Sequence, residues 1–250
     1  MTNAIRLPRA LLLAPLLGAA LTTFASSPAL AGAARRTYAV GSFERLRIDG
    51  PYEVRLETGN APGASASGDA RALDSLNVAV EGGTLIVRAG AGNWGEVHAS
   101  TAIPIVVTLT TPSLRSVNLN GGGQLMIKRM VGQRLALLIN GAGTLAATGI
   151  DADLFSATII GNGTMTLAGR TGRARYQLSG AGNFAAGNMI ANDLVAHSDG
   201  TGTMLVAARY TASLYASSLG PITVLGNAKC VVKAPPGTPI RCGKGAGKGN

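Results

Sequence analysis

The chain has 250 residues, a formal net charge of +10, 35 glycines and only 4% aromatic residues. Its basic residues are scattered, with no arginine-rich helix and no aromatic platform between them, which argues against a nucleic-acid-binding protein. A positive protein attracts anionic partners, such as acidic polysaccharides and phosphate head groups.

The first 31 residues have the pattern of a secretory signal peptide. Arg6 and Arg9 precede the apolar stretch Ala10–Phe24, and Ala29-Leu30-Ala31 has the small residues of a cleavage site. The apolar stretch is shorter than the roughly 20 residues of a membrane-spanning helix. No later segment is long and apolar enough to cross a membrane. We therefore expect an exported protein (periplasmic, surface-located or secreted) with no transmembrane anchor in the mature chain.

Alternating apolar residues predict strands in an opening section that is less regular than the rest. We expect strands within Phe43–Glu57 and Leu76–Arg88, with a hairpin turn at Glu81-Gly82-Gly83-Thr84. The spans Thr58–Ala72 and Ala89–Ser100 are rich in Gly, Ala and Ser, and we interpret them as loops.

From Gly121 onward the sequence repeats itself about every twenty residues. Each copy is marked by a Gly-x-Gly triplet, and the first glycines are 20, 20, 19, 20 and 20 residues apart. Glycine tolerates the backbone angles of a tight turn, and its small size lets successive turns stack closely. The glycines of this series are Gly121, Gly123, Gly141, Gly143, Gly161, Gly163, Gly180, Gly182, Gly200, Gly202 and, in a last copy that keeps only the first glycine, Gly220.

Apolar residues alternate on both sides of each triplet, which predicts two short strands per repeat. Before the triplets stand segments such as Leu135-x-Leu137-x-Ile139. Two such strands cannot bury a core alone, but stacked copies can. The position after each triplet is occupied by Leu125, Leu145, Met165, Phe184, Met204 and Val224.

These observations predict an all-β fold, a parallel β-solenoid within a single domain of residues 32–228, with repeat coils at about 101–228. The segment 103–119 alternates in the same way and is interpreted as one further coil without its glycines. An antiparallel meander or sandwich would also alternate, but such folds rarely keep so constant a period.

Residues 229–250 are predicted to be a disulfide-closed segment that caps the solenoid, followed by a flexible basic tail from Gly243. Cys230 and Cys242 lack a C-x-x-C spacing and a neighbouring histidine, which disfavours a redox or metal pair. In an oxidising compartment they are expected to form one disulfide, which would stabilise the fold by on the order of 3 kcal/mol.

A catalytic site on this scaffold would need clustered acids. Asp151, Asp153 and Asp193 are expected near one edge of the coils, but nearby coils offer arginines rather than further acids, so solvated loop residues are the favoured interpretation. His98 and His197 do not converge on a metal site. We therefore predict no catalytic, cofactor-binding or metal-ligating residues, and no cofactor.

The order of these parts resembles the bacterial GIN domain family, described as the head domain of auto-transporter adhesins. The resemblance rests on the opening segment from Phe43 to Leu56, on Thr111-Pro112-x-Leu114, and on the Gly-x-Gly series, and it covers roughly residues 40 to 226. It implies a right-handed parallel β-helix, a role in cell adhesion, and no defined catalytic residues.

The leading functional hypothesis is a non-catalytic cell-envelope or adhesion protein that binds anionic envelope polysaccharide or other surface proteins, with homo-oligomers also compatible with the sequence. One alternative is a carbohydrate-active β-helix enzyme that acts on an acidic polysaccharide. Another is a periplasmic interaction scaffold that pairs through its ends. The candidate basic surface consists of Lys128, Arg129, Arg134, Arg170, Arg173, Arg175 and Arg209.

Overall fold

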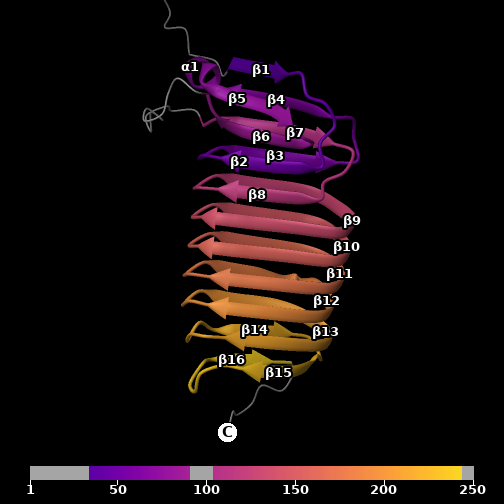
Figure 1. Ribbon diagram of the computed structural model, residues 1–250, viewed down its shortest axis with the longest axis vertical. Helices are drawn as coiled ribbons and strands as arrows, with labels where there is room; N and C mark the ends of the chain where they lie inside the picture. Colours follow the sequence, from indigo (N-terminus) through magenta and orange to yellow (C-terminus); the bar gives the residue numbers. More distant parts are fainter. Residues whose placement is uncertain (1–33, 91–103, 244–250) are drawn as a thin grey trace, which may run out of the picture. The chain divides into compact units, whose positions relative to one another are not determined.

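A computed structural model describes residues 34–90 and 104–243, which form an almost all-β structure (Figure 1). The predicted signal peptide, most of the loop expected at Ala89–Ser100, with His98, and most of the basic tail lie outside the described residues. No helix in the described part is long and apolar enough to cross a membrane.

The repeats form stacked parallel coils, a β-solenoid of about six turns. Parallel pairing is in register, so that Leu145 lies between Leu125 and Met165. Each strand runs without a break from one triplet to the next. The strands are β9 (Gln124–Gly141), β10 (Thr144–Gly161), β11 (Thr164–Ser179), β12 (Asn183–Asp199) and β13 (Thr203–Ala216).

The continuity of these strands corrects the expectation of two short strands per repeat. Each long strand bends at a second corner, opposite the triplets, and hydrogen bonding to the neighbouring coils continues around the bend (Figure 1). We call the half that follows a triplet the post-triplet face and the half that precedes the next triplet the pre-triplet face. At the second corner Gly149 and Gly169 have positive φ values of 65° and 146°.

The core lies between the two faces, where inward side chains form columns along the solenoid. In one column large and small residues alternate, so that Tyr176 lies between Ala157 and Ala196. Its ring packs against Phe155 and Phe184, with ring centroids 6.3 and 4.7 Å away. All five residues are at most 2% exposed. The two alanines in the adjacent coils therefore leave room for the Tyr176 ring, which packs against aromatic rings of both neighbouring coils.

The first glycine of each triplet, from Gly121 to Gly200, has a φ between 95° and 150°, where a residue with a side chain is strained. The third glycine has no such φ and is restricted by space alone. A Cβ on Gly143 would lie 2.8 Å from a methyl group of Leu119 and 3.0 Å from the carbonyl oxygen of Gly123. The first glycine is restricted by space as well, since a Cβ on Gly141 would lie 2.8 Å from the carbonyl oxygen of Gly121.

The sequence pattern aligned Gly220 with the first glycine of each triplet. In the structure the last repeat is two residues shorter than that alignment requires. A Cβ on Gly220 would lie 2.6 Å from the carbonyl oxygen of Gly202, so Gly220 occupies the third position of the triplet. Ile222, rather than Val224, continues the column of Met204. The Ser218 hydroxyl, which accepts a 2.8 Å hydrogen bond from the Gly200 amide, compensates for the shortened turn.

The opening section has the expected strands and the hairpin turn at Gly82-Gly83, but Thr58–Ala72 is not simply a loop. Ala64 and Ala66 alternate inward and are buried, and Asp69 caps a short helix by accepting hydrogen bonds from two backbone amides. The elements are β1 (Ala34–Tyr38), β2 (Arg45–Asp49), β3 (Glu53–Thr58), β4 (Gly63–Gly68), α1 (Ala70–Asp74), β5 (Leu76–Glu81) and β6 (Thr84–Ala89).

The strands β7 (Val106–Thr111) and β8 (Ser116–Asn120) do not form one coil stacked on β9, contrary to expectation. Strand β3 lies between β7 and β9, and β2 lies between β6 and β8. The pair β2–β3 is therefore inserted as a separate rung, and Gly50 serves at its turn as the triplet glycines do elsewhere. The Thr111 hydroxyl donates a 2.5 Å hydrogen bond to the Phe43 carbonyl oxygen. This bond links the end of β7 to the segment that precedes β2.

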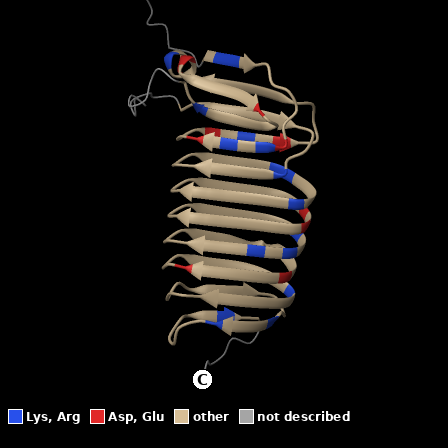
Figure 2. Cartoon of the chain, viewed as in Figure 1, with Lys and Arg blue, Asp and Glu red and all other residues tan. Residues whose placement is uncertain are grey.

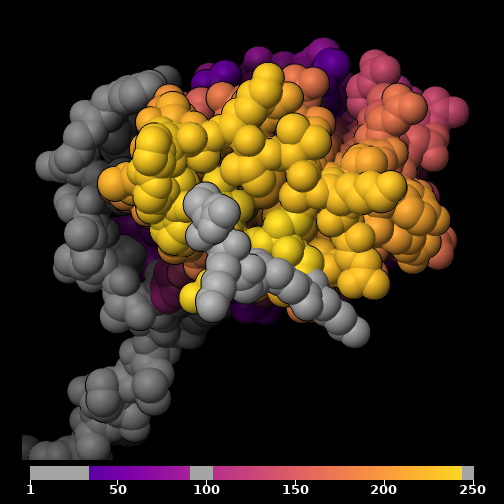
Figure 3. All heavy atoms as spheres, turned by 90° about the horizontal axis from the view of Figure 1, so that it is seen from below, coloured from indigo at the N-terminus to yellow at the C-terminus, as the bar shows by residue number. Residues whose placement is uncertain are grey.

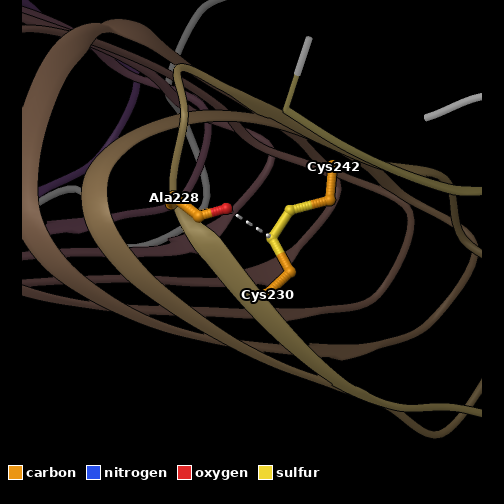
Figure 4. Close-up of a disulfide and its surroundings, with 3 residues drawn as sticks. All are labelled: Ala228, Cys230 and Cys242. Atoms are coloured by element: carbon orange, nitrogen blue, oxygen red, sulfur yellow. Dashed lines mark hydrogen bonds between the residues drawn. A yellow bond between two sulfur atoms is a disulfide. The ribbon is translucent and has the colours of Figure 1, made fainter. Parts of the chain in front are cut away.

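The C-terminal end is closed by a disulfide between Cys230 and Cys242 (Figure 4). It joins the two faces within the last rung, because Cys230 lies beside Ala212 on the pre-triplet face and Cys242 beside Val224 on the post-triplet face. It thus takes the place of an apolar contact across the core. The last strands are β14 (Ile222–Leu225), β15 (Lys229–Lys233) and β16 (Ile240–Cys242).

Candidate functional site

The basic residues expected to form one side are divided among three places. Lys128 lies on the post-triplet face, in register with Glu57 of β3. Arg129, Arg170 and Arg209 line a groove at the second corner, and Arg134, Arg173 and Arg175 line a depression on the pre-triplet face. Most charged residues of the repeats are near the second corner, at the right in Figure 2.

The corner groove has a volume of about 960 Å³, and three glycines are part of its lining. Gly149, Gly169 and Gly172 form part of it, and a Cβ on Gly169 would overlap the backbone of Ile150. Arg129 takes the corresponding corner position in β9 with a φ of 64°. These corner residues were missed at the sequence level, although Gly149 and Gly169 keep the twenty-residue period.

Acids partly neutralise the corner groove. Arg170 donates two hydrogen bonds to one oxygen of Asp151, from Nη2 at 2.6 Å and from Nε at 3.1 Å. This contact holds the pKa of the Asp151 carboxyl below its usual value. Asp153 also lines the groove. Arg170 is therefore already engaged with a carboxylate of its own chain.

The three aspartates considered for catalysis do not form one cluster. Asp193 accepts a 2.6 Å hydrogen bond from the Thr211 hydroxyl, lies in register with Arg173 on the next rung, and does not line the groove that contains Asp151 and Asp153. Asp151 is held ionised by Arg170 and is a poor proton donor near neutral pH. Within residues 34–90 and 104–243, no group of three or more His, Cys, Asp and Glu could hold a metal ion.

The depression on the pre-triplet face has a different character, because its lining contains three arginines and no acid. Arg134 and Arg173 lie on either side of Leu154, one rung above and one below, and Arg175 lies beside Ser156. With about 4.8 Å between strands, the backbones of Arg134 and Arg173 are roughly 10 Å apart. We call the set Arg134, Arg173 and Arg175 the arginine pocket.

The arginine pocket has a volume of about 300 Å³, and apart from the arginines and Ser156 its lining is apolar. All three arginines are exposed, whereas Leu154 and Ser156 are half-buried. A guanidinium group presents a planar fork of donors that matches a carboxylate or phosphate in two parallel hydrogen bonds. The pocket can therefore offer guanidinium donors to an anionic group, with the apolar part of the same ligand on Leu154.

Parallel coils of about twenty residues around an apolar interior place the protein among the β-solenoids. The family described as "Putative auto-transporter adhesin, head GIN domain" matches residues 42–228. The chain belongs to this family, as its sequence predicted. The family description points to an adhesin-type protein located outside the cell or at its surface. No curated protein matches the chain.

Solved structures show the same fold at low sequence identity. A putative adhesin from Bacteroides fragilis is 20% identical, with a TM-score of 0.74 over 84% of this chain and 96% of its own. A putative lipid binding protein from Parabacteroides distasonis has a TM-score of 0.67 at 19% identity over the same shares. A putative adhesin from Parabacteroides merdae has a TM-score of 0.64 at 16% identity, again over 84% and 96%.

Proposed function

We propose that this protein is an exported, non-catalytic envelope protein of the adhesion type that binds a carboxylate-bearing polysaccharide through the arginine pocket. The observation that carries the proposal is the placement of Arg134, Arg173 and Arg175 around one depression whose lining contains no acid. Anionic sugars offer carboxylates for these guanidinium groups and apolar ring faces for Leu154.

A polymer fits this site better than a small anion does, because the pocket opens onto a regular face. Arg134 and Arg173 are separated by two rungs, roughly 10 Å, which is comparable to the length of two sugar rings in an extended chain. Neighbouring outward positions of the same face, such as Thr158 and Gln177, offer hydrogen-bonding groups at successive rungs. These side chains support a ligand that runs along the solenoid.

The test compares two triple variants that remove the same charge. R134Q/R173Q/R175Q empties the arginine pocket, and R129Q/R170Q/R209Q changes the corner groove. Retention on immobilised polygalacturonate should fall by at least about tenfold for the pocket variant, since each lost charge-assisted hydrogen bond contributes about 1.5–3 kcal/mol. The corner variant should bind as the unmodified protein does. Equal losses in both variants would reduce the interaction to net charge and contradict the proposed site.

A further inference from the structure

The charge of the protein is unevenly distributed along the chain. Residues 34–90 contain seven basic and seven acidic residues, whereas residues 200–250 contain six basic residues and no Asp or Glu. Arginines of the opening section have acidic partners, such as Arg36 with Asp74 at 2.5 Å and Arg55 with Glu53 at 2.6 Å. In Figure 2 the coils that follow β12 carry blue segments and no red ones. Positive charge therefore accumulates without neutralisation at the C-terminal end.

The last rung combines these cations with exposed aliphatic side chains. Lys229, Val231 and Lys233 alternate outward on β15, continuing the outward positions of the coil above. Arg241 is exposed on β16. Val231 is 58% exposed, and the inward-facing Val232 is 46% exposed because no further coil in the described chain covers it. Figure 3 shows this end of the solenoid face-on, with the last rung towards the viewer.

A second copy of the chain is a poor occupant of this end. Strand β15 pairs only with β13, and β16 only with β14, among the described strands, so the rung has a free hydrogen-bonding edge. At the other end of the described chain the terminal strands are β1, which carries Arg35 and Arg36, and β5. Edge-to-edge pairing of two last rungs would bring Lys229, Lys233 and Arg241 of the two copies together, and lysines on an edge strand oppose such pairing.

An anionic lipid surface satisfies both features of the end. Its phosphate groups attract clustered basic residues, and its interface accepts aliphatic side chains next to them. We propose that the last rung, through Lys229, Lys233, Arg241 and the exposed Val231 and Val232, docks end-on to an anionic lipid surface. The arginine pocket lies on the coils of β9 to β11 and stays uncovered in this arrangement. The inference goes beyond the proposed polysaccharide binding and does not depend on it.

Co-sedimentation with lipid vesicles tests this proposal. Purified protein should bind vesicles of phosphatidylglycerol with phosphatidylcholine and should not bind vesicles of phosphatidylcholine alone. Each basic residue at such a surface strengthens binding about fivefold, so K229Q/K233Q/R241Q should weaken the partition coefficient on the order of a hundredfold. The pocket variant R134Q/R173Q/R175Q, which loses the same three charges, should bind nearly as the unmodified protein does. A similar loss in both variants, or no binding by the unmodified protein, would overturn the proposal.

Two further measurements separate this proposal from its rivals. V231N/V232N should weaken binding to the anionic vesicles several-fold while leaving net charge unchanged, and unaltered binding would rule out contact with the apolar part of the interface. The end variant K229Q/K233Q/R241Q should keep its retention on polygalacturonate. If it lost that retention instead of vesicle binding, the last rung would be a polysaccharide site and the lipid proposal would be wrong. Circular dichroism checks that each variant is folded.

Discussion

The rings of Tyr176 and Phe184 face each other across the interior, with centroids 4.7 Å apart and an angle of 39° between their planes. The Tyr176 hydroxyl is buried and has no hydrogen-bond partner among the described residues. Burying a hydroxyl group without a partner costs about 1–3 kcal/mol. The ring therefore stabilises the core while its hydroxyl opposes that effect.

Removing the hydroxyl should not destabilise the protein. We expect the free energy of unfolding of Tyr176→Phe to be equal to that of the unmodified protein or up to about 1 kcal/mol higher, because the ring contacts stay. Tyr176→Ala removes the ring, and its free energy of unfolding should be about 3–5 kcal/mol lower than that of the unmodified protein. Urea unfolding at neutral pH measures both. A loss of stability in the phenylalanine variant would mean that the hydroxyl has a partner after all.

Alkaline pH should destabilise the fold partly through Tyr176. Burial raises the pKa of its phenol above the ordinary value of 10.0, so the folded protein keeps the proton that the unfolded chain loses. The stabilisation is fully present below pH 10 and is lost as the pH rises through and beyond that value. The melting temperature of Tyr176→Phe should fall less steeply above pH 10 than that of the unmodified protein. Parallel curves would contradict this role for Tyr176.

The first glycine of a triplet should be irreplaceable where its φ is positive. Gly161 has a φ of 111°, and a Cβ there would lie 2.7 Å from the carbonyl oxygen of Gly141. Gly161→Ala should therefore cost at least about 2 kcal/mol in thermal or chemical unfolding. Gly122 provides the matched control, since its Cβ would meet nothing within 4 Å. Equal effects of the two substitutions would contradict the stacked-turn geometry.

The inner column should be as sensitive to truncation as any close-packed core. Leu145 is buried between Leu125 and Met165, and Leu145→Ala should cost about 2–5 kcal/mol. Thr144 is the adjacent exposed residue, and Thr144→Ala should change the free energy of unfolding by no more than about 0.5 kcal/mol. An unchanged melting temperature in Leu145→Ala would be incompatible with the stacking of these coils.

The disulfide should protect the last rung more than the rest of the solenoid. C230A/C242A removes a cross-link between residues twelve apart, whose loop entropy corresponds to about 3 kcal/mol. Coils of a repeat fold contact mainly their neighbours, so the loss should stay local. Hydrogen exchange of the amides in Lys229–Lys233 should accelerate strongly, whereas that of the β10 amides should not. Uniform acceleration throughout would show that the solenoid unfolds as one unit.

The regular part of the fold could be predicted because one spacing determines it. A period of about twenty residues with alternating apolar positions allows little besides stacked coils, and the triplets locate one corner of each coil. The second corner was harder to recognise, because only Gly149 and Gly169 repeat there while Arg129 takes the same position in β9. The shortened last repeat was misaligned by two residues, since Val224 and Ile222 are both apolar.

The opening section could not be derived from periodicity. The insertion of β2 and β3 as a rung between strands that follow much later in the chain leaves no regular spacing. Strand β4 has only small residues on its buried side, Ala64 and Ala66, and it pairs antiparallel to β7. Its composition of Gly, Ala and Ser is therefore the same as that of a loop.

The candidate site was only partly visible in the sequence. The charged residues were identified, but their grouping depends on which rung and which face each one occupies. Arg134 and Arg173 are neighbours because both are in register with Leu154. Arg170 is only three residues before Arg173, but it lies at the second corner beside Asp151. The charge of the last rung is visible in the sequence, because no acid follows Asp199.

Polysaccharide binding without cleavage can be tested by mixing the purified protein with polygalacturonate of defined length and measuring complex formation and polymer length together. Size-exclusion chromatography with light scattering reports both quantities. We expect a complex that weakens in R134Q/R173Q/R175Q and a polymer whose length does not change. Shortened chains would show catalysis and direct attention to Asp151 and Asp153, and the absence of any complex would contradict polysaccharide binding at the arginine pocket.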